Sequence, residues 1–302
     1  MMKHNWKITW IMLLLFLVSQ LIGLVVVDKN IDYKKTAETG KASFKHLPYN
    51  IERPEVREST SFIYILLAVF VGTVIVFIVI KFKQINFWKI WFFLSVALSL
   101  GIAFSAFINS IIAGVIAIVL AIIKIFRPNV FVHNFTEIFV YAGIAAIFVP
   151  IMNILSVVLL LIGISIYDAY AVWRSKHMIK LARFQAKSKV FAGILIPYRR
   201  EAPAVKTKKV EMKKTTAKIV KPKKGKVAML GGGDIAFPLL FAGVVLKTSG
   251  FLKSLIIPVF VTIALFILLY LAKKDKFYPA MPFLTAGCFT GYGVVLLINL
   301  LI

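Results

Sequence analysis

Long stretches of apolar residues recur along the 302-residue chain and constrain its fold more than any other feature. A helix needs about 20 apolar residues to cross the hydrocarbon core of a bilayer, which is roughly 30 Å thick. Hydrophobic residues make up 60% of the sequence and charged residues only 16%, a composition unlike that of soluble globular domains. We therefore predict an all-α polytopic membrane protein with nine transmembrane helices, at Ile8–Val27, Phe62–Ile80, Phe87–Phe104, Ser105–Ile123, Val130–Val149, Ile151–Val172, Val227–Leu246, Ser254–Leu271 and Pro282–Ile302.

Two of these boundaries divide apolar runs that are too long for one crossing. Residues 87–123 form a run of 37 residues, about 55 Å as a helix, and we place a break among the polar residues of Ser105–Asn109. A second run, residues 130–172, is divided at Pro150–Asn153, because proline disfavours continuation of a helix. The first span follows two lysines, as a signal peptide would. Its apolar stretch is long and no small-residue cleavage site follows it, so we expect it to be retained.

Basic residues gather on one side of the predicted bundle. The chain has 37 Lys and Arg against 12 Asp and Glu, and 18 of the 37 lie in the long loop 173–226. With the N-terminus in the cytoplasm, that side collects 28 of the 37, so the positive-inside rule predicts a cell-membrane protein with its C-terminus outside. Without the long loop the two sides carry 10 and 9 basic residues, so the orientation depends on this loop.

The same loop divides the chain into three parts. We predict a six-span bundle over residues 1–172, a flexible basic loop over 173–226 and a three-span bundle over 227–302. One apolar patch in the loop, Val190–Pro197, is interpreted as a short interfacial or loop-packed segment. We expect the basic loop to contact anionic lipid head groups rather than nucleic acid. A single cysteine, Cys288, permits no intrachain disulfide, and four scattered histidines predict no metal site.

Three acidic residues lie inside predicted spans, where an ionisable side chain costs at least roughly 2.5–3.5 kcal/mol. Glu137 is near the basic end of its span, and we interpret it as an interfacial residue or the partner of a nearby Lys or Arg. Asp168 lies four residues before the end of the sixth span, and Asp234 seven residues after the start of the seventh. At 1.5 Å per residue, both carboxylates are about 6–10 Å inside the same membrane face. They can therefore face each other.

Two facing carboxylates allow three interpretations. Held a few ångströms apart they cannot both ionise easily, so the pair shares a proton. In an aspartic protease, one carboxylate takes a proton from an attacking water and the other donates a proton to the developing oxyanion. The same pair could relay protons or cations in a channel or transporter. It could also be structural, with each acid bonded to a neighbouring hydroxyl.

The residues that flank the aspartates favour the protease. Asp234 closes a run of three glycines, each costing about 1 kcal/mol against alanine in a helix interior, and such a run suits the close approach of another backbone. Two prolines in the run Tyr278-Pro279-Ala280-Met281-Pro282 make a stiff, non-helical beginning to the last span, on the same face as both aspartates. We expect this segment to form a wall of the site. A transporter would often have two related halves, and the sequence has no such internal pairing.

Together these elements resemble the GxGD intramembrane aspartyl proteases, the family of presenilin and signal peptide peptidase. That family has YD in the sixth span, GxGD in the seventh and PAL at the start of the ninth. This chain has, in the same order, Tyr167-Asp168, Gly231-x-Gly233-Asp234 and Pro279-Ala280-Met281. The resemblance covers essentially the whole chain. Residues 233–238 look more like signal peptide peptidase, whereas the predicted orientation looks more like presenilin. Met281 stands where the family usually has leucine, a residue of similar size.

The resemblance implies an intramembrane aspartic endopeptidase that needs no cofactor. It implies that Asp168 and Asp234 are catalytic and that Tyr167 helps to position Asp168. It also implies that the site is shaped by two segments, which are Gly231, Gly232 and Gly233, and Pro279, Ala280 and Met281. The implied substrate is a single transmembrane helix, with a cytoplasmic C-terminus if the orientation holds, that pairs as a strand with residues just before Leu230. The match looks closest to compact microbial homologues, which work without the partner subunits of γ-secretase, so no obligate partner subunit is expected.

Overall fold

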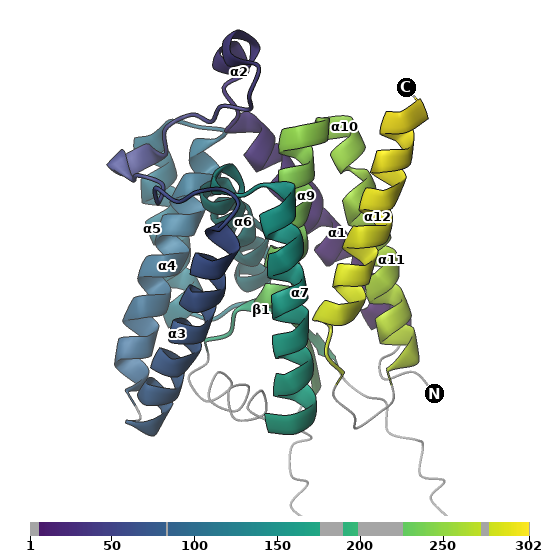
Figure 1. The fold of residues 1–302 in the computed structure, drawn as a ribbon. Coiled ribbons are helices and arrows are strands. Elements are labelled where there is room, and N and C mark those ends of the chain that lie inside the picture. Colours follow the sequence, from purple (N-terminus) through teal and green to yellow (C-terminus); the bar gives the residue numbers. More distant parts are fainter. Residues whose placement is uncertain (1–5, 83, 176–189, 199–225, 273–277, 302) are drawn as a thin grey trace, which may run out of the picture.

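The computed structural model describes residues 6–82, 84–175, 190–198, 226–272 and 278–301, which form an upright bundle of helices (Figure 1). The longer helices are α1 (Trp6–Lys29), α3 (Ser61–Lys81), α4 (Ile85–Ser105), α5 (Ser110–Phe126), α6 (Val130–Phe148), α7 (Ile154–Tyr170), α9 (Gly232–Ser249), α11 (Ile256–Leu271) and α12 (Met281–Leu301). The shorter elements are α2 (Tyr33–Thr39), η1 (Pro48–Asn50), η2 (Val149–Ile151), η3 (Ala171–Ser175) and α10 (Phe251–Ser254).

The predicted helical membrane fold is confirmed. Eight of the described helices are long and apolar enough to cross a membrane, and α5, with 17 residues, is a shorter apolar helix at the position of the fourth predicted span. Both predicted breaks are found. The break between α4 and α5 falls at residues 106–109, and the one after α6 passes through η2 before Asn153 caps α7. The two termini lie at opposite ends of the bundle, as an odd number of crossings requires (Figure 1).

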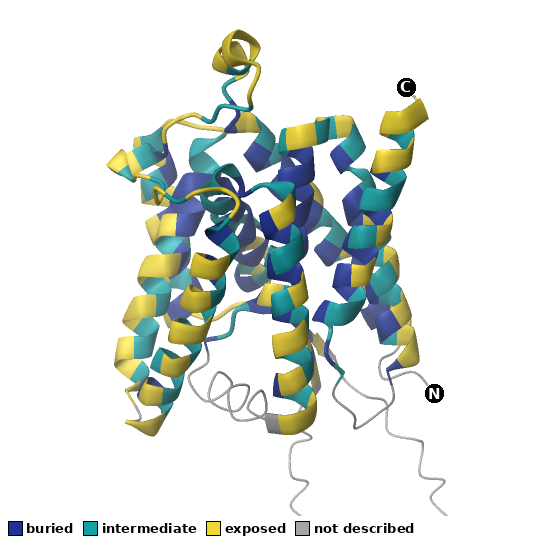
Figure 2. Ribbon diagram, viewed as in Figure 1, coloured by how far each residue is buried: buried dark blue, intermediate teal, exposed yellow. Residues whose placement is uncertain are grey.

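Helix α9 occupies the centre of the bundle. It packs against α1, α6, α7 and α12, and it is the most buried of the candidate spans, whereas α3 is the most exposed. Burial falls toward the outer helices in Figure 2, where exposed positions line α3 and α4. The short side chains on α9 and its neighbours allow this close packing: Gly23 of α1 lies against Leu239, and Gly243 lies against Val149. The helix that carries Asp234 is therefore held on all sides by protein.

The prediction that the seventh span begins at Val227 is wrong, because residues 226–231 form a strand. This strand, β2 (Lys226–Gly231), pairs antiparallel with β1 (Gly193–Tyr198), and α9 begins only at Gly232. The apolar patch that we interpreted as an interfacial segment is thus mainly β1. Side chains alternate along β2: Ala228 and Leu230 are buried, whereas Val227 and Met229 are exposed. This two-residue period distinguishes the segment from the helix that follows it.

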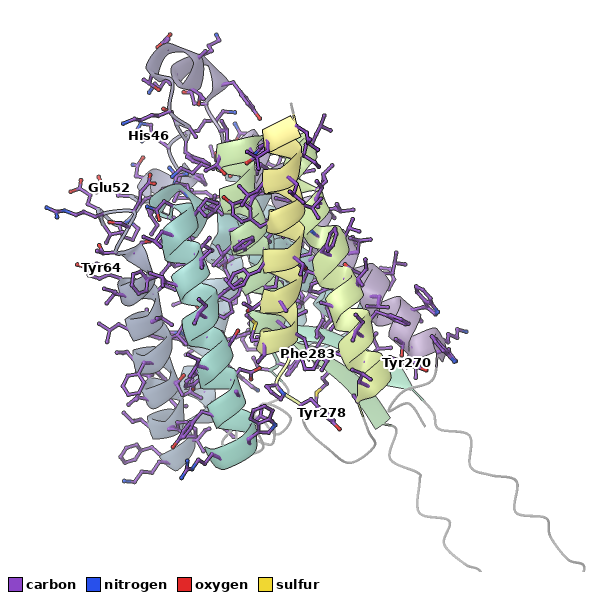
Figure 3. All side chains as sticks on the ribbon, turned by 45° about the vertical axis from the view of Figure 1, so that its right-hand side comes forward. His46, Glu52, Tyr64, Tyr270, Tyr278 and Phe283 are labelled. Atoms are coloured by element: carbon purple, nitrogen blue, oxygen red, sulfur yellow. The ribbon has the colours of Figure 1, made fainter. Side chains whose placement is uncertain are left out.

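The hairpin and the predicted wall lie at one end of the bundle, opposite the polar loop between α1 and α3. Figure 3 shows Tyr278 and Phe283 at the lower end of α12, whereas His46 and Glu52 lie at the upper end of the molecule. Most of the predicted basic loop, residues 176–189 and 199–225, is outside the described residues, as are residues 273–277.

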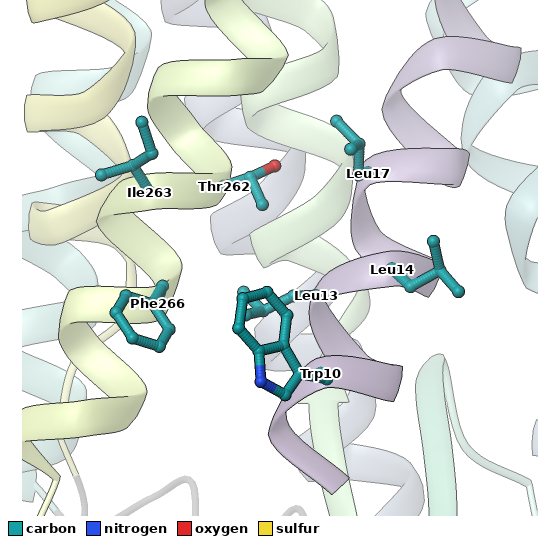
Figure 4. A pocket seen from close by; sticks show the side chains of 7 residues that line it. All are labelled: Trp10, Leu13, Leu14, Leu17, Thr262, Ile263 and Phe266. Carbon is teal, nitrogen blue, oxygen red and sulfur yellow. The ribbon is translucent and has the colours of Figure 1, made fainter. Parts of the chain in front are cut away.

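A hollow of about 290 Å³ between α1 and α11 is apolar (Figure 4). Its walls include Trp10 and Leu13 of α1 and Phe266 of α11. Thr262 also lines the hollow, but its hydroxyl donates to the carbonyl oxygen of Pro258 at 2.7 Å. The lining therefore has no side chain suited to acid–base or nucleophilic catalysis, and neither Asp168 nor Asp234 is part of it.

Close contact between α4 and α6 makes Gly143 sensitive to substitution. A Cβ at Gly143 would overlap the carbonyl oxygen of Ser99, so we expect Gly143→Ala to destabilise the protein by about 1–3 kcal/mol through overpacking. Gly72 of α3 is the matched control, because nothing lies within 4 Å of a Cβ built there. Thermal unfolding in detergent measures the difference. An equal effect of Gly72→Ala would contradict the prediction.

Candidate active site

Asp168 lies in the last turn of α7 and is held by the beginning of α12. The backbone N–H of Met281 donates a hydrogen bond to its carboxylate at 3.1 Å, and the backbone of Ala280 makes a further interaction with the same group. Pro279 and Met281 are both buried. The segment predicted as a wall of the site therefore contacts an aspartate directly, through its backbone rather than through its side chains.

Asp234 lies in the first turn of α9, directly after the hairpin. Its carboxylate interacts with the backbone of Gly231, the last residue of β2, and with the charge of Asp168. A buried glutamine of α1 also contacts this turn of α9: Gln20 Nε2 donates to the carbonyl oxygen of Ile235, the residue after Asp234, at 2.8 Å. Asp168 and Asp234 thus lie at the hairpin end of the bundle, on two helices that pack against each other, within range for their charges to interact.

The three glycines before Asp234 have different surroundings. A Cβ at Gly231 would lie 3.2 Å from the Asp234 carboxylate, and a Cβ at Gly232 would overlap the hydroxyl of Tyr141 on α6. Gly233 is exposed, and a Cβ there would lie in ordinary contact with Phe237, at 3.4 Å. The close contact with Tyr141 therefore requires glycine most strongly at Gly232, which is the variable position of the GxGD motif. The motif itself specifies glycine only at Gly231 and Gly233.

Tyr167 of α7 reaches toward α3. Its side chain is 40% exposed, and its hydroxyl donates to Thr73 Oγ1 of α3 at 3.3 Å. The hydrogen bond links α7 to α3, so any effect of Tyr167 on Asp168 passes through the placement of α7.

Ser165 and Thr285, two residues with hydroxyl side chains near Asp168, were not predicted from the sequence. Ser165 Oγ lies 2.7 Å from Thr285 Oγ1, so this hydrogen bond joins α7 to α12 one turn from Asp168 and Met281. Gln20, whose side-chain amide bonds to the backbone next to Asp234, was likewise not predicted. The only available signal was the presence of polar side chains inside predicted spans, which is too common for small hydroxyl residues to single these out.

Glu137 is confirmed as the partner of a basic residue, but it is buried rather than interfacial. It forms an ion pair with Lys124 of α5, and both side chains are at most 2% exposed. Its carboxylate also accepts hydrogen bonds from Tyr141 and from the N–H of Gly193 in β1. His133, one turn earlier on α6, is also buried, and its Nε2 lies 2.8 Å from the Gly193 carbonyl oxygen.

The fold and the sequence place the chain in the class of intramembrane aspartyl proteases. The sequence profile of the family described as signal-peptide peptidase, presenilin aspartyl protease matches residues 14–300, and the chain belongs to this family. Among curated proteins, none matches the chain.

Two solved structures share the fold, each of a presenilin family intramembrane aspartate protease. The structure in space group C222 has a TM-score of 0.61 at 17% identity and covers 96% of this chain and 99% of its own. The structure in space group P2 has a TM-score of 0.59 at 20% identity and covers 95% and 96%. The predicted presenilin-like fold is thus confirmed.

The hydrogen bond between Ser165 and Thr285 should contribute to the attachment of α12. Thr285→Val removes the hydroxyl at a buried position and leaves Ser165 unpaired, so we expect a loss of about 1–2 kcal/mol of stability. Thr290→Val on the same helix is the control, because Thr290 is exposed and its hydroxyl bonds only to carbonyl groups of α12. Thermal unfolding of both variants provides the measurement, and equal losses would contradict this role.

Proposed function

We propose that the protein is an intramembrane aspartic endopeptidase in which Asp168 and Asp234 activate one water molecule. The observation that supports the proposal is the placement of both carboxylates at the hairpin end of the bundle, within range of each other's charge, with the Met281 N–H bound to Asp168. Two carboxylates that interact in this way can share one proton, which gives the site an acid and a base at the same time.

The reaction follows from that shared proton. The ionised carboxylate takes a proton from the water as its oxygen attacks the scissile carbonyl carbon, and the protonated carboxyl donates its proton to the carbonyl oxygen. The resulting gem-diol collapses when one carboxyl group delivers a proton to the leaving nitrogen and the other carboxylate takes a proton from a gem-diol hydroxyl. The C–N bond breaks, and the pair again holds one shared proton. The products are a carboxyl terminus and an amine terminus, and either aspartate can take either role.

The substrate is a single transmembrane helix that must unwind before it is cut. Strand β2 supports this idea, because its register with β1 directs the backbone groups of Val227 and Met229 away from the hairpin. No described residue bonds to these outward groups. We infer that an unwound substrate segment adds to this edge as a strand, next to the Asp234 turn. Gly231, Gly232, Gly233, Pro279, Ala280 and Met281 then shape the site around it.

The membrane context of the proposal follows the charge pattern. We place the N-terminus in the cytoplasm and the C-terminus outside the cell membrane, which predicts substrates with cytoplasmic C-termini. Residues 1–172 and 227–302 form the two catalytic parts, and the basic loop 173–226 between them contacts anionic lipids. The chain acts without obligate partner subunits.

Replacing either aspartate tests the reaction directly. Asp168→Asn and Asp234→Asn keep the side-chain size but replace the carboxyl group, which can gain and lose a proton, with an amide that cannot act as acid or base. We therefore expect each to lower cleavage by at least about 10²–10⁴-fold. The assay uses a synthetic peptide with one transmembrane helix, incubated with the purified protein in detergent. Cleavage products are quantified by mass spectrometry, and thermal unfolding verifies that each variant is folded.

Asp32→Asn is the matched control, because Asp32 caps α2 in the polar loop at the other end of the bundle, and asparagine caps helices equally well. The control should cut at the wild-type rate. Wild-type cleavage by either dyad variant would rule out the assignment. Ion or proton flux into liposomes without any cleavage would instead favour the channel or transporter.

A further inference from the structure

The hairpin beside Asp234 has two edges, and the register determines which backbone groups each edge presents. The N–H of Gly232 donates to the carbonyl oxygen of Ala192 at 3.1 Å, and Ile194 pairs with Leu230. In an antiparallel ladder the residues between such bonded pairs direct their N–H and C=O groups outward. Gly193 and every second residue after it therefore present their backbone groups to the outer edge of β1.

Side chains of α6 occupy this outer edge. Asn134 bonds to both backbone groups of Leu195: its Nδ2 donates to the carbonyl oxygen at 2.8 Å, and its Oδ1 accepts from the N–H at 2.9 Å. One turn away, the N–H of Gly193 donates to Glu137 Oε2 at 2.8 Å, and His133 Nε2 lies 2.8 Å from the Gly193 carbonyl oxygen. These three α6 side chains, His133, Asn134 and Glu137, are called the α6 clamp below.

The third outward position of β1 is Pro197, which has no N–H to offer. The α6 clamp thus bonds the backbone groups of β1 at two outward positions, and at the third only the carbonyl oxygen of Pro197 points outward. On β2, both the N–H and the C=O of Val227 and Met229 point outward, and no described residue bonds to them.

A buried charge network connects the α6 clamp to the turn before Asp234. Glu137 forms its ion pair with Lys124, whose Nζ also donates to Thr136 Oγ1 at 3.1 Å. The Glu137 carboxylate accepts the Tyr141 hydroxyl as well, and that hydroxyl packs against Gly232. One carboxylate therefore holds both β1 and the tyrosine that supports the glycine turn. Its burial is tolerated because each of its contacts is a charge-assisted hydrogen bond.

We propose that the α6 clamp acts as a substitute strand that fixes the register of the hairpin and so positions Asp234 and the free edge of β2. The inference rests on the proposed protease function but goes beyond the aspartate pair. His133, Asn134 and Glu137 are positioning residues, which touch neither the reacting atoms nor the aspartates. They leave β2 as the edge that a substrate strand can join.

Asn134→Leu tests the α6 clamp, because leucine keeps the approximate size of the side chain but offers neither hydrogen bond to Leu195. We expect kcat to fall about tenfold or more and cleavage to spread to neighbouring peptide bonds, since a strand that is no longer held can shift its register. Asn86→Leu, at an exposed position in α4, is the control and should change neither property. Cut positions are read by mass spectrometry of the products, and thermal unfolding is measured in parallel.

If Asn134→Leu cuts more slowly at unchanged positions, and the fraction of unfolded protein accounts for the lower rate, then the α6 clamp only stabilises the fold and the proposal is overturned. Unchanged rates and products would also overturn it. Hydrogen exchange provides a readout that needs no cleavage: the amides of β1 and β2 should exchange at least tenfold faster in Asn134→Leu. Unchanged exchange would refute the α6 clamp even if the proposed protease activity were absent, so the two failures can be told apart.

The ion pair supplies a second test. Glu137→Gln leaves Lys124 buried without its counter-charge and should lower stability, whereas the double variant with Lys124→Met removes both charges and should recover stability. The glutamine oxygen can still accept the Gly193 N–H, so the double variant should cut at wild-type positions. Scattered cutting by a stable double variant would contradict the role of that hydrogen bond.

Discussion

The satisfaction of backbone hydrogen bonds inside an apolar bundle is the constraint on which the rest of this structure depends. A helix satisfies most of its own backbone groups, but a strand satisfies none of its own, and a two-stranded hairpin still leaves half of its groups facing outward, where hydrocarbon supplies no partners. The hairpin before α9 is the exception to an otherwise helical architecture. Side chains of α6 bond the outward groups of Gly193 and Leu195, and Pro197 has no N–H, so the β1 edge lies beside the aspartates with few unpaired groups.

The same constraint explains how the aspartates are held. Asp168 accepts its hydrogen bond from the backbone of Met281, at a point where α12 is only beginning and its first N–H groups have no partner within the helix. Asp234 likewise interacts with the backbone of Gly231, where β2 ends. Each carboxylate thus lies where a break in regular structure leaves backbone donors available. The prolines and glycines of the sequence produce those breaks.

The candidate site could be predicted to different depths for different residues. Asp168 and Asp234 were identifiable because an ionised group inside an apolar run is costly and therefore rare. For Glu137 the sequence offered two interpretations, an interfacial residue or the partner of a nearby Lys or Arg, because a residue near a helix end can also be served by water; Lys124 itself was not singled out. Ser165, Thr285 and Gln20 could not be singled out, because a hydroxyl or amide in a span has many possible partners, including its own helix.

Local sequence patterns were enough to predict the helical membrane fold, a number of spans close to the one found, the approximate limits of most of them, and the breaks near Ser105 and Pro150. These features follow from local composition, because hydrophobic length and helix-breaking residues act within a few turns of chain. The tertiary structure decided that residues 226–231 pair as a strand with residues 193–198, and that α6 closes the edge of that pair. The tertiary packing also brings the Met281 backbone to the Asp168 carboxylate and the Tyr167 hydroxyl to Thr73. These outcomes depend on which distant segments meet, and no local pattern specifies that choice.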